Sequence, residues 1–234
     1  MAAFTMVNLP GPRFSTALLC ALHCGRRRYG DAVTRNGGGG RMHIAILILA
    51  AGASRRMRGM DKLLEPVKGR PLLAHVVQMA LQSGLGVTVT LPPDRPARAA
   101  ALVGLQAHLV TVPDAGTGMA TSLRAGVATL PEGGAVMVLL ADMPEVDGAD
   151  LRAMIDAYRT TPGQIHRAVT PAGVPGHPVI FPPSARAALL ALQGDTGARA
   201  LLADADVVQV TLPHAHATTD LDTPEDWAAW RAGG

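Results

Sequence analysis

The sequence predicts an α/β protein with one three-layer, doubly wound domain, in which a mostly parallel (mixed) sheet lies between two layers of helices. The chain has 234 residues, which suits a single domain with a core of several layers. From residue 42 onward, short apolar runs alternate with helical segments, as in a sheet covered on both faces. The order up to residue 141 is strand, helix, strand, helix, strand, helix, strand, which indicates a doubly wound half with ligand sites beyond the carboxyl ends of its strands.

The individual elements follow from these runs and from their flanking residues. The expected strands are 43–49, 86–91, 107–112, 135–141, 165–169, 179–181 and 206–212. The expected helices are 71–82, 95–104, 119–130, 150–158, 184–193, 198–203 and 224–231. Helix starts are marked by Asp147 or Asp150, and by Thr223-Pro224-Glu225-Asp226, where a Thr cap precedes a proline and two acids in the first turn.

Residues 1–41 differ from the rest of the chain in composition. They hold six arginines against one acid, whereas residues 42–234 carry 15 basic and 17 acidic side chains, so the net charge of +3 becomes −2 for the domain. We expect residues 1–41 to be a disordered extension or wrongly assigned upstream sequence, with Met42 as the true start. Bulk charge therefore gives no support to nucleic-acid binding.

Other classes are also disfavoured by composition. Both cysteines, Cys20 and Cys24, precede residue 42, so the domain can contain neither a disulfide nor a thiolate metal site. The longest apolar run, residues 44–51, is far shorter than the roughly 20 residues that span a membrane. We therefore expect a cytoplasmic protein without a membrane partner.

The most informative segment follows the first expected strand. Small residues at Ala50, Ala51 and Gly52 form a turn, and Gly52 is expected to let the backbone bend where a Cβ would clash, so that successive N–H groups face one anion. Neither of the two common glycine patterns for phosphate or dinucleotide binding is present. The turn is followed by fixed positive charge, which donates charge-assisted hydrogen bonds to phosphate oxygens; the residues are Arg55, Arg56, Arg58 and Lys62. This pattern predicts a polyphosphate site.

Two acidic segments are candidate metal ligands. Asp142 ends a buried-type strand and Pro144 stops the strand from continuing, so the carboxylate is well placed for Mg²⁺, although a turn residue is the alternative. Asp220 and Asp222 alternate, so they share one face of an extended segment, although the whole string also suits a capped helix start.

The string Leu49-Ala50-Ala51-Gly52-x-Ser54-x-Arg56-Met57, followed by Asp61-Lys62-Leu63-Leu64, resembles the signature loop of nucleotidyltransferases that activate a phosphorylated acceptor with an NTP. The branch that it resembles is the molybdenum cofactor cytidylyltransferases, within the molybdopterin-guanine dinucleotide synthase-like NTP transferases. The resemblance covers nearly all of residues 43–231, with four motifs in the family's order. It implies a Rossmann-like nucleotidyltransferase fold for residues 42–234. The implied reaction joins CMP from CTP to the terminal phosphate of molybdenum-molybdopterin and releases pyrophosphate.

The resemblance also implies a role for each motif. Arg56 and Lys62 would act on the triphosphate as catalytic residues. The nucleotide would be bound by Leu49, Ala50, Ala51, Gly52, Ser54, Gly118, Met119 and Ser122. Mg²⁺ would be held by Asp142 and by Asp222, with Asp220 as the alternative second ligand. The acceptor would be bound by His177, Asp195 and Arg199; His177 would orient it, because a phosphate monoester is already ionised near neutral pH and needs no general base.

Several alternatives stay open at this point. The Cβ of Ala51 favours CTP, since the guanylyl branch tends to carry glycine there, but Asp114 stands where the family often carries asparagine. A GTP-dependent guanylyltransferase, a sugar-phosphate nucleotidyltransferase and a non-catalytic molybdenum cofactor chaperone are the other candidates. The expected partners are CTP and molybdenum-molybdopterin, followed by a molybdoenzyme or its maturation chaperone.

Overall fold

The computed structural model describes residues 33–35, 41–194, 198–203 and 205–233. The main strands of this described part are β2 (Arg41–Leu49), β5 (Gly86–Leu91), β6 (His108–Thr111), β7 (Ala135–Leu140), β8 (Ile165–Val169), β9 (Pro175–Phe181) and β10 (Val207–Thr211). They form one sheet in the order β10-β8-β9-β7-β2-β5-β6. β9 runs antiparallel to β7 and β8, and the other neighbouring pairs are parallel. The predicted mixed, mostly parallel sheet is confirmed.

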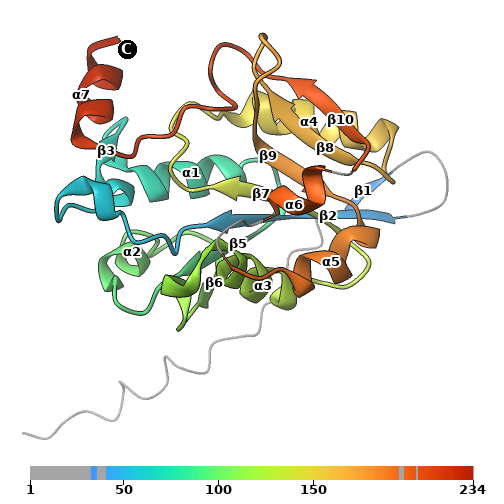
Figure 1. Cartoon of the computed structure of the whole chain (residues 1–234), viewed down its shortest axis with the longest axis horizontal. Coiled ribbons are helices and arrows are strands. Elements are labelled where there is room, and N and C mark those ends of the chain that lie inside the picture. The colour runs from blue at the N-terminus through green and yellow to red at the C-terminus, as the bar shows by residue number, and fades with distance from the viewer. Residues whose placement is uncertain (1–32, 36–40, 195–197, 204, 234) are drawn as a thin grey trace, which may run out of the picture.

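Helices cover both faces of this sheet (Figure 1). They are α1 (Leu72–Leu81), α2 (Pro96–Ala100), α3 (Met119–Thr129), α4 (Gly148–Thr160), α5 (Arg186–Ala191), α6 (Arg199–Ala203) and α7 (Pro224–Gly233). Buried residues of α1 and α4 pack in one core cluster, and those of α3 and α5 pack in the other. The three-layer, doubly wound architecture is therefore confirmed.

The central strand shows how the sequence creates two cores. Successive side chains of a strand point to opposite faces, so Ile44, Ile46 and Ile48 pack on the α1 side, while Leu47 packs on the α3 side. Gly126 lets α3 come close to the sheet, because a Cβ there would lie 2.3 Å from Cδ1 of Leu47. Both faces of β2 are thus buried, which explains its continuous apolar run.

Some element boundaries differ from the expectations. β9 begins at Pro175 rather than at 179, so it includes the Gly-His-Pro string. The helix expected at 95–104 is shortened to α2, because its end tightens into bonds from Leu102 N to Ala99 O and from Val103 N to Ala100 O. A hairpin of β3 (Pro66–Val67) and β4 (Arg70–Pro71) was not predicted, since two-residue strands have no periodicity to detect.

The segment before residue 42 is described at residues 33–35 and at Arg41, the first residue of β2. Residues 33–35 form β1 (Val33–Arg35), which pairs antiparallel with the start of β2, with Arg35 opposite Arg41. The domain boundary at residue 42 stays a prediction. In the part of the chain that the structure describes, no helix combines the length and the apolar character needed to cross a membrane.

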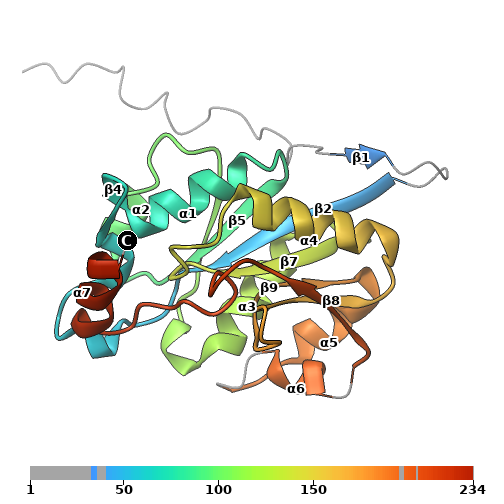
Figure 2. The same ribbon diagram turned by 90° about the horizontal axis from the view of Figure 1, so that it is seen from above.

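The topology determines where a ligand site is expected. The chain passes from β2 to β5 on one side of the sheet and reaches β7 on the other, so β2 lies at the topological switch point. In doubly wound sheets, ligands bind at the carboxyl ends of the strands at this point. The C-terminal helix α7 and the β3–β4 hairpin lie together at this end of the molecule (Figure 2), linked by an ion pair of 2.7 Å between Arg231 and Glu65.

Candidate active site

The signature loop, residues 49–54, leaves β2 at the switch point. Ala50 N donates to Thr90 O at 3.1 Å, and Ala141 N donates to Leu49 O at 3.2 Å, so the loop starts between the ends of β5 and β7. Asp142 directly follows Ala141 and therefore lies beside this loop. Strand pairing alone brings the first two predicted motifs together.

Four predicted site residues meet at the edge of the loop. Lys62 Nζ lies 2.5 Å from Asp142 Oδ2 and 2.5 Å from Asp222 Oδ1. Arg56 forms an ion pair with the other carboxylate oxygen of Asp222. The side chains of Lys62, Asp142 and Asp222 are 13%, 17% and 19% exposed, whereas that of Arg56 is 70% exposed. The fold thus joins Lys62 to Asp222, which lie 160 positions apart in the sequence.

The charge of Lys62 is stabilised by this arrangement. Burial alone would lower the pKa of Lys62, but hydrogen bonds and charge from Asp142 and Asp222 outweigh burial and raise the pKa above its usual range. An ammonium group has three donors, and the two carboxylates use two of them. The third donor has no acceptor among the described residues, so Lys62 can bind an additional anion.

One oxygen of this carboxylate pair has the chemistry of a divalent-cation ligand. Asp142 Oδ1 is buried and has no hydrogen-bond partner within the described ranges. A buried carboxylate oxygen without a donor is unfavourable, and Mg²⁺ prefers oxygen ligands of this kind. Asp220 is exposed, and partial burial together with the charges of Asp222 and Asp142 raises its pKa. Asp220 therefore lies near Asp142 and Asp222 but takes no part in their hydrogen bonds with Lys62.

Asp222 is held in place by the start of α7. Leu221 and Trp227 on either side are buried, with 3% and 2% exposure. Thr223 N donates to Asp226 Oδ2 at 2.8 Å, and Asp226 N donates to Thr223 Oγ1 at 3.1 Å, a reciprocal capping box. The helix start expected at Thr223 is confirmed, and it fixes the backbone next to Asp222.

Two expectations about the loop need correction. A Cβ at Gly52 would meet no atom within 4 Å, so the idea that this glycine relieves a clash inside the chain is wrong. The left-handed residues of the segment are instead Ser54, with φ of 49°, and Arg58, with φ of 51°. Arg58 pairs at 2.6 Å with Glu225 of α7, both well exposed, so it does not add to the cations at the carboxylates. The side chain of Arg55 lies outside the described residues.

The second nucleotide-side motif begins α3. Gly118 has φ of 125°, a conformation that favours glycine, and it precedes the first residue of the helix. Met119 is 46% exposed, whereas Ser122 is buried at 5% exposure. Ala120 N donates to Gly194 O at 3.3 Å, which places the start of α3 beside the connection from α5 to α6. Asp195, in that connection, lies outside the described residues.

The acceptor-side histidine lies on β9, close to the carboxylates. His177 N donates to Ala217 O at 2.9 Å. Gly176 makes this approach possible, because a Cβ there would lie 1.7 Å from Ala217 O. Burial, and then the charge of Arg167, lower the pKa of His177 to about 4, although the charge of Asp142 opposes the shift. The imidazole is therefore neutral near neutral pH.

The comparisons with known proteins identify the family. Residues 46–210 match the MobA-like NTP transferase domain. The chain belongs to this family. The fold described above agrees with this membership, so the expectation of an NTP transferase family is confirmed.

The proteins to which the chain is similar differ in length and in identity. The chain is 36% identical over 121 residues to the bifunctional protein GlmU of Clavibacter sepedonicus, a match that covers 50% of the chain and 24% of that protein. It therefore spans about a quarter of the length of the curated relatives that it matches. Rv0371c of Mycobacterium tuberculosis H37Rv superposes with a TM-score of 0.72 at 28% identity, covering 81% of this chain and 97% of that chain. The manganese complex of Rv0371c superposes with a TM-score of 0.68 at 26% identity, covering 80% and 97%.

Two arginines of this NTP transferase domain were not predicted as site residues. Arg98 of α2 is completely buried under the signature loop and pairs with Asp61 at 2.7 Å. Arg167 of β8 donates to Gly176 O at 3.1 Å, and burial followed by the charge of Arg199 lowers its pKa. The available signal for Arg167 was a charged residue inside an apolar strand. Arg199 itself is exposed at the first position of α6.

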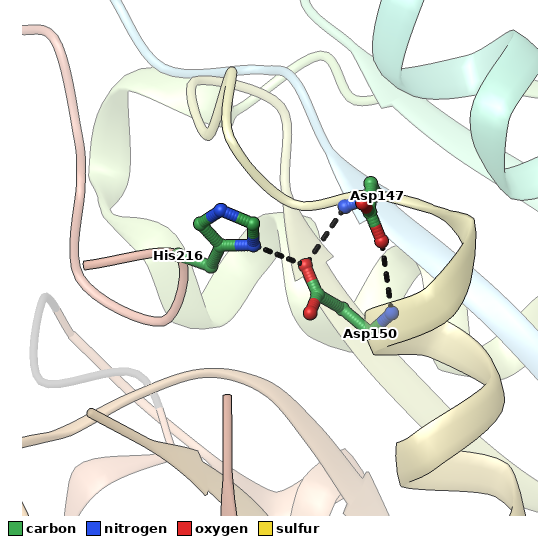
Figure 3. A group of neighbouring side chains, drawn as sticks. All are labelled: Asp147, Asp150 and His216. Carbon is green, nitrogen blue, oxygen red and sulfur yellow. Dashed lines mark hydrogen bonds and ion pairs between the residues drawn. The ribbon is translucent and has the colours of Figure 1, made fainter. Parts of the chain in front are cut away.

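A cavity of about 600 Å³ lies away from the signature loop, where α1, the start of α4 and α7 meet, and its lining includes Lys68, Arg70, His75, Glu145, His216 and Trp230. At its edge, Asp147, Asp150 and His216 place potential metal-ligand atoms within 4.8 Å of one another (Figure 3). Asp147 Oδ1 accepts from Asp150 N at 3.0 Å, and Asp150 Oδ2 accepts from Asp147 N at 2.9 Å and lies 2.8 Å from His216 Nδ1. The two contacts between Asp147 and Asp150 form the capping box of α4, which accounts for these two acids as a helix start, and His216 adds an ion pair to Asp150.

Proposed function

We propose that this protein transfers CMP from CTP to the terminal phosphate of molybdenum-molybdopterin, forming molybdopterin cytosine dinucleotide and pyrophosphate. The observation that carries the proposal is the meeting of Lys62, Asp142 and Asp222 beside the signature loop. A chaperone without catalysis has no need for two carboxylates and a lysine held together at the switch point. The sequence resemblance supports the choice of branch.

The acceptor side supports a phosphorylated acceptor. Arg167, His177 and Arg199 lie near one another, since the charge of Arg167 affects the pKa of His177 and that of Arg199 affects the pKa of Arg167. Two permanent cations next to a neutral imidazole suit a phosphate monoester. The charge of Asp142 also acts on His177, so the acceptor group is expected to bind close to the carboxylate pair.

The reaction then depends on position and charge. The ionised acceptor phosphate attacks the α-phosphorus of CTP, the bond to the bridging oxygen breaks, and pyrophosphate leaves with the electron pair. Lys62 and Arg56 stabilise the negative charge that grows on the leaving group, and His177 orients the acceptor without taking a proton. Mg²⁺ held by Asp142 and Asp222 would neutralise further charge on the phosphate oxygens.

The choice of CTP is supported by Ala51. Ala51 is 5% exposed, and its Cβ takes up space that a glycine would leave free. A smaller pyrimidine therefore suits the loop better than guanine. Asp114 is exposed at the loop before α3 and replaces the asparagine that the resembling family often carries, so the contact to base or ribose on that side is expected to differ.

The decisive experiment compares nucleotides and acceptors directly. The full chain is incubated with CTP, GTP, ATP or UTP, together with molybdenum-molybdopterin or a sugar 1-phosphate, and pyrophosphate and the nucleotide product are measured. We expect product from CTP and molybdenum-molybdopterin. Preference for GTP would assign guanylyl transfer, and product from the sugar phosphate would assign sugar activation. Tight binding of molybdenum-molybdopterin without any turnover would assign a chaperone.

The metal site is tested by three asparagine substitutions that keep side-chain size. Asp142→Asn and Asp222→Asn should each lower turnover by about 100-fold or more, because each removes a charge from the Mg²⁺ ligands. Asp220→Asn is the matched control and should change turnover little. Full activity of both Asp142→Asn and Asp222→Asn at saturating Mg²⁺ would contradict the shared site. Loss of activity in Asp220→Asn alone would identify Asp220 as the second ligand.

A further inference from the structure

A buried arginine, Arg98, holds the signature loop through hydrogen bonds. The side chain of Arg98 is 0% exposed. Its Nη1 donates to Ala50 O at 2.6 Å and to Gly52 O at 2.8 Å, and its Nη2 donates to Ser54 Oγ at 3.1 Å. Asp61 accepts from Nε at 2.7 Å and from Nη2 at 2.9 Å. One guanidinium thus binds three positions of the loop and the acid next to Lys62.

These contacts determine which way the loop amides point. In a planar trans peptide, the carbonyl of one residue is antiparallel to the N–H of the next. Since Arg98 holds the carbonyls of Ala50 and Gly52, the N–H groups of Ala51 and Ala53 point away from it. Neither N–H has an acceptor in the part of the chain that the structure describes.

A second arginine of the same segment adds to this effect. Arg95 Nη2 donates to Ala53 O at 2.9 Å, so the N–H of Ser54 is also directed away from the arginine side. Arg95 Nη1 lies 3.5 Å from Asp61. The loop carbonyls that the two arginines bind therefore point to one side, and the N–H groups that follow them point to the opposite side. An anion is bound by N–H groups that share one direction in this way.

We propose that Arg98 is a positioning residue that aligns the N–H groups of the signature loop for the triphosphate of the nucleotide. Arginine is needed because its planar fork reaches several acceptors at once, whereas a lysine offers a single point charge. Asp61 makes the buried charge tolerable, and Arg98 in turn helps to lower the pKa of Asp61 against the effect of burial. The inference rests on the NTP chemistry of the family and goes beyond the proposed choice of CTP and acceptor.

The test measures affinity for inorganic tripolyphosphate and for CTP by calorimetry, with the full chain in Mg²⁺ buffer. Arg98→Lys and Arg98→Ala should each weaken the binding of both ligands by about 10- to 100-fold, the scale expected for the loss of one hydrogen bond to a charged group. Added guanidinium should restore part of the affinity of Arg98→Ala, and it should have no effect on Arg98→Lys. Rescue of affinity without a rise in melting temperature would separate alignment of the loop from a purely structural role.

Two control variants separate alignment from loss of stability. Arg186→Ala removes another partly buried arginine that donates to a backbone carbonyl, Leu130 O at 3.1 Å, and should bind as the wild type does. Ile155→Ala truncates a buried side chain of α4, and it serves as the variant whose loss of melting temperature matches that of the Arg98 variants. Wild-type affinity in both Arg98 variants would overturn the proposal. The proposal would also be overturned if the Arg98 variants lost no more affinity than Ile155→Ala does.

A double variant covers the case in which Arg98→Ala does not fold. Arg98→Met with Asp61→Asn leaves no unpaired buried charge, and it should fold but bind tripolyphosphate weakly. Wild-type affinity in this variant would overturn the proposal, as would a wild-type protein that does not bind tripolyphosphate. Arg98-dependent binding in a protein that makes no cytidylyl product would refute the proposed function alone.

Discussion

Acidification should destabilise the protein through His177. Burial and Arg167 lower the pKa of this imidazole from 6.5 to about 4. Between these two values, the unfolded chain binds a proton that the folded protein does not bind. The contribution of His177 to stability is therefore fully present above pH 6.5, and it is lost as the pH falls toward 4.

The magnitude follows from the size of the shift. One pKa unit corresponds to about 1.4 kcal/mol, so the difference between 6.5 and about 4 corresponds to at most about 3–4 kcal/mol of unfolding free energy. Burial also lowers the pKa values of His75 and His166, and these groups add pH dependence of the same sign. The contribution of His177 is therefore obtained as the difference in the pH dependence of unfolding free energy between the wild type and a His177→Gln variant.

The assay is urea unfolding between pH 7 and pH 4.5 in the presence of EDTA. His177→Gln should lose part of the wild-type decrease in stability on acidification, and His214→Gln, an exposed histidine, should keep all of it. Titration of the His177 ring by NMR gives an independent value. A ring that titrates near 6.5, or an unchanged pH slope in His177→Gln, would refute the reasoning.

Three further outcomes follow from the same contacts. Lys62→Ala should lower turnover by about 10²- to 10³-fold, the scale for one preorganised charge-stabilising donor, and normal turnover with a lower melting temperature would make Lys62 structural. Gly176→Ala should destabilise the fold by about 1–3 kcal/mol in thermal or urea unfolding, because its Cβ would lie 1.7 Å from Ala217 O; an unchanged stability would contradict the close approach. Deletion of residues 1–41 should leave melting temperature and activity intact, although it removes β1, and a large loss of either would show that the segment belongs to the domain.

The fold could be predicted because its main signals are local. The apolar runs of β2 and β7 are long and buried on both faces, and Asp142 follows one of them directly. Asp222 was harder to assign, because its partner Lys62 lies 160 positions away and no periodicity links them. Its selection over Asp220 depended on the resemblance.

The supporting arginines could not be predicted for a physical reason. Arg98 lies in a short helix among alanines, where a charged residue normally faces solvent. Two of its acceptors are the backbone carbonyls of Ala50 and Gly52, and any sequence provides carbonyls, so no side-chain pattern reveals these contacts. The one available signal was Asp61, the single acid in the signature string, which pairs with Arg98 outside that string.

The balance of charge at the site indicates how a nucleotide can bind there. The carboxylates near the signature loop are Asp61, Asp142, Asp220 and Asp222, and the described cations paired with them are Arg56, Lys62, Arg95 and Arg98. Four negative charges thus face four positive charges before any ligand arrives. A triphosphate adds several negative charges that this set does not neutralise, and the third donor of Lys62 compensates only part of them.

Nucleotide affinity should therefore rise steeply with Mg²⁺ concentration in the wild type. The rise should be smaller in Asp142→Asn, because that variant removes the carboxylate with the unpaired buried oxygen. Equal nucleotide affinity with Mg²⁺ and with EDTA would show that the side chains alone neutralise the triphosphate, which would contradict this account.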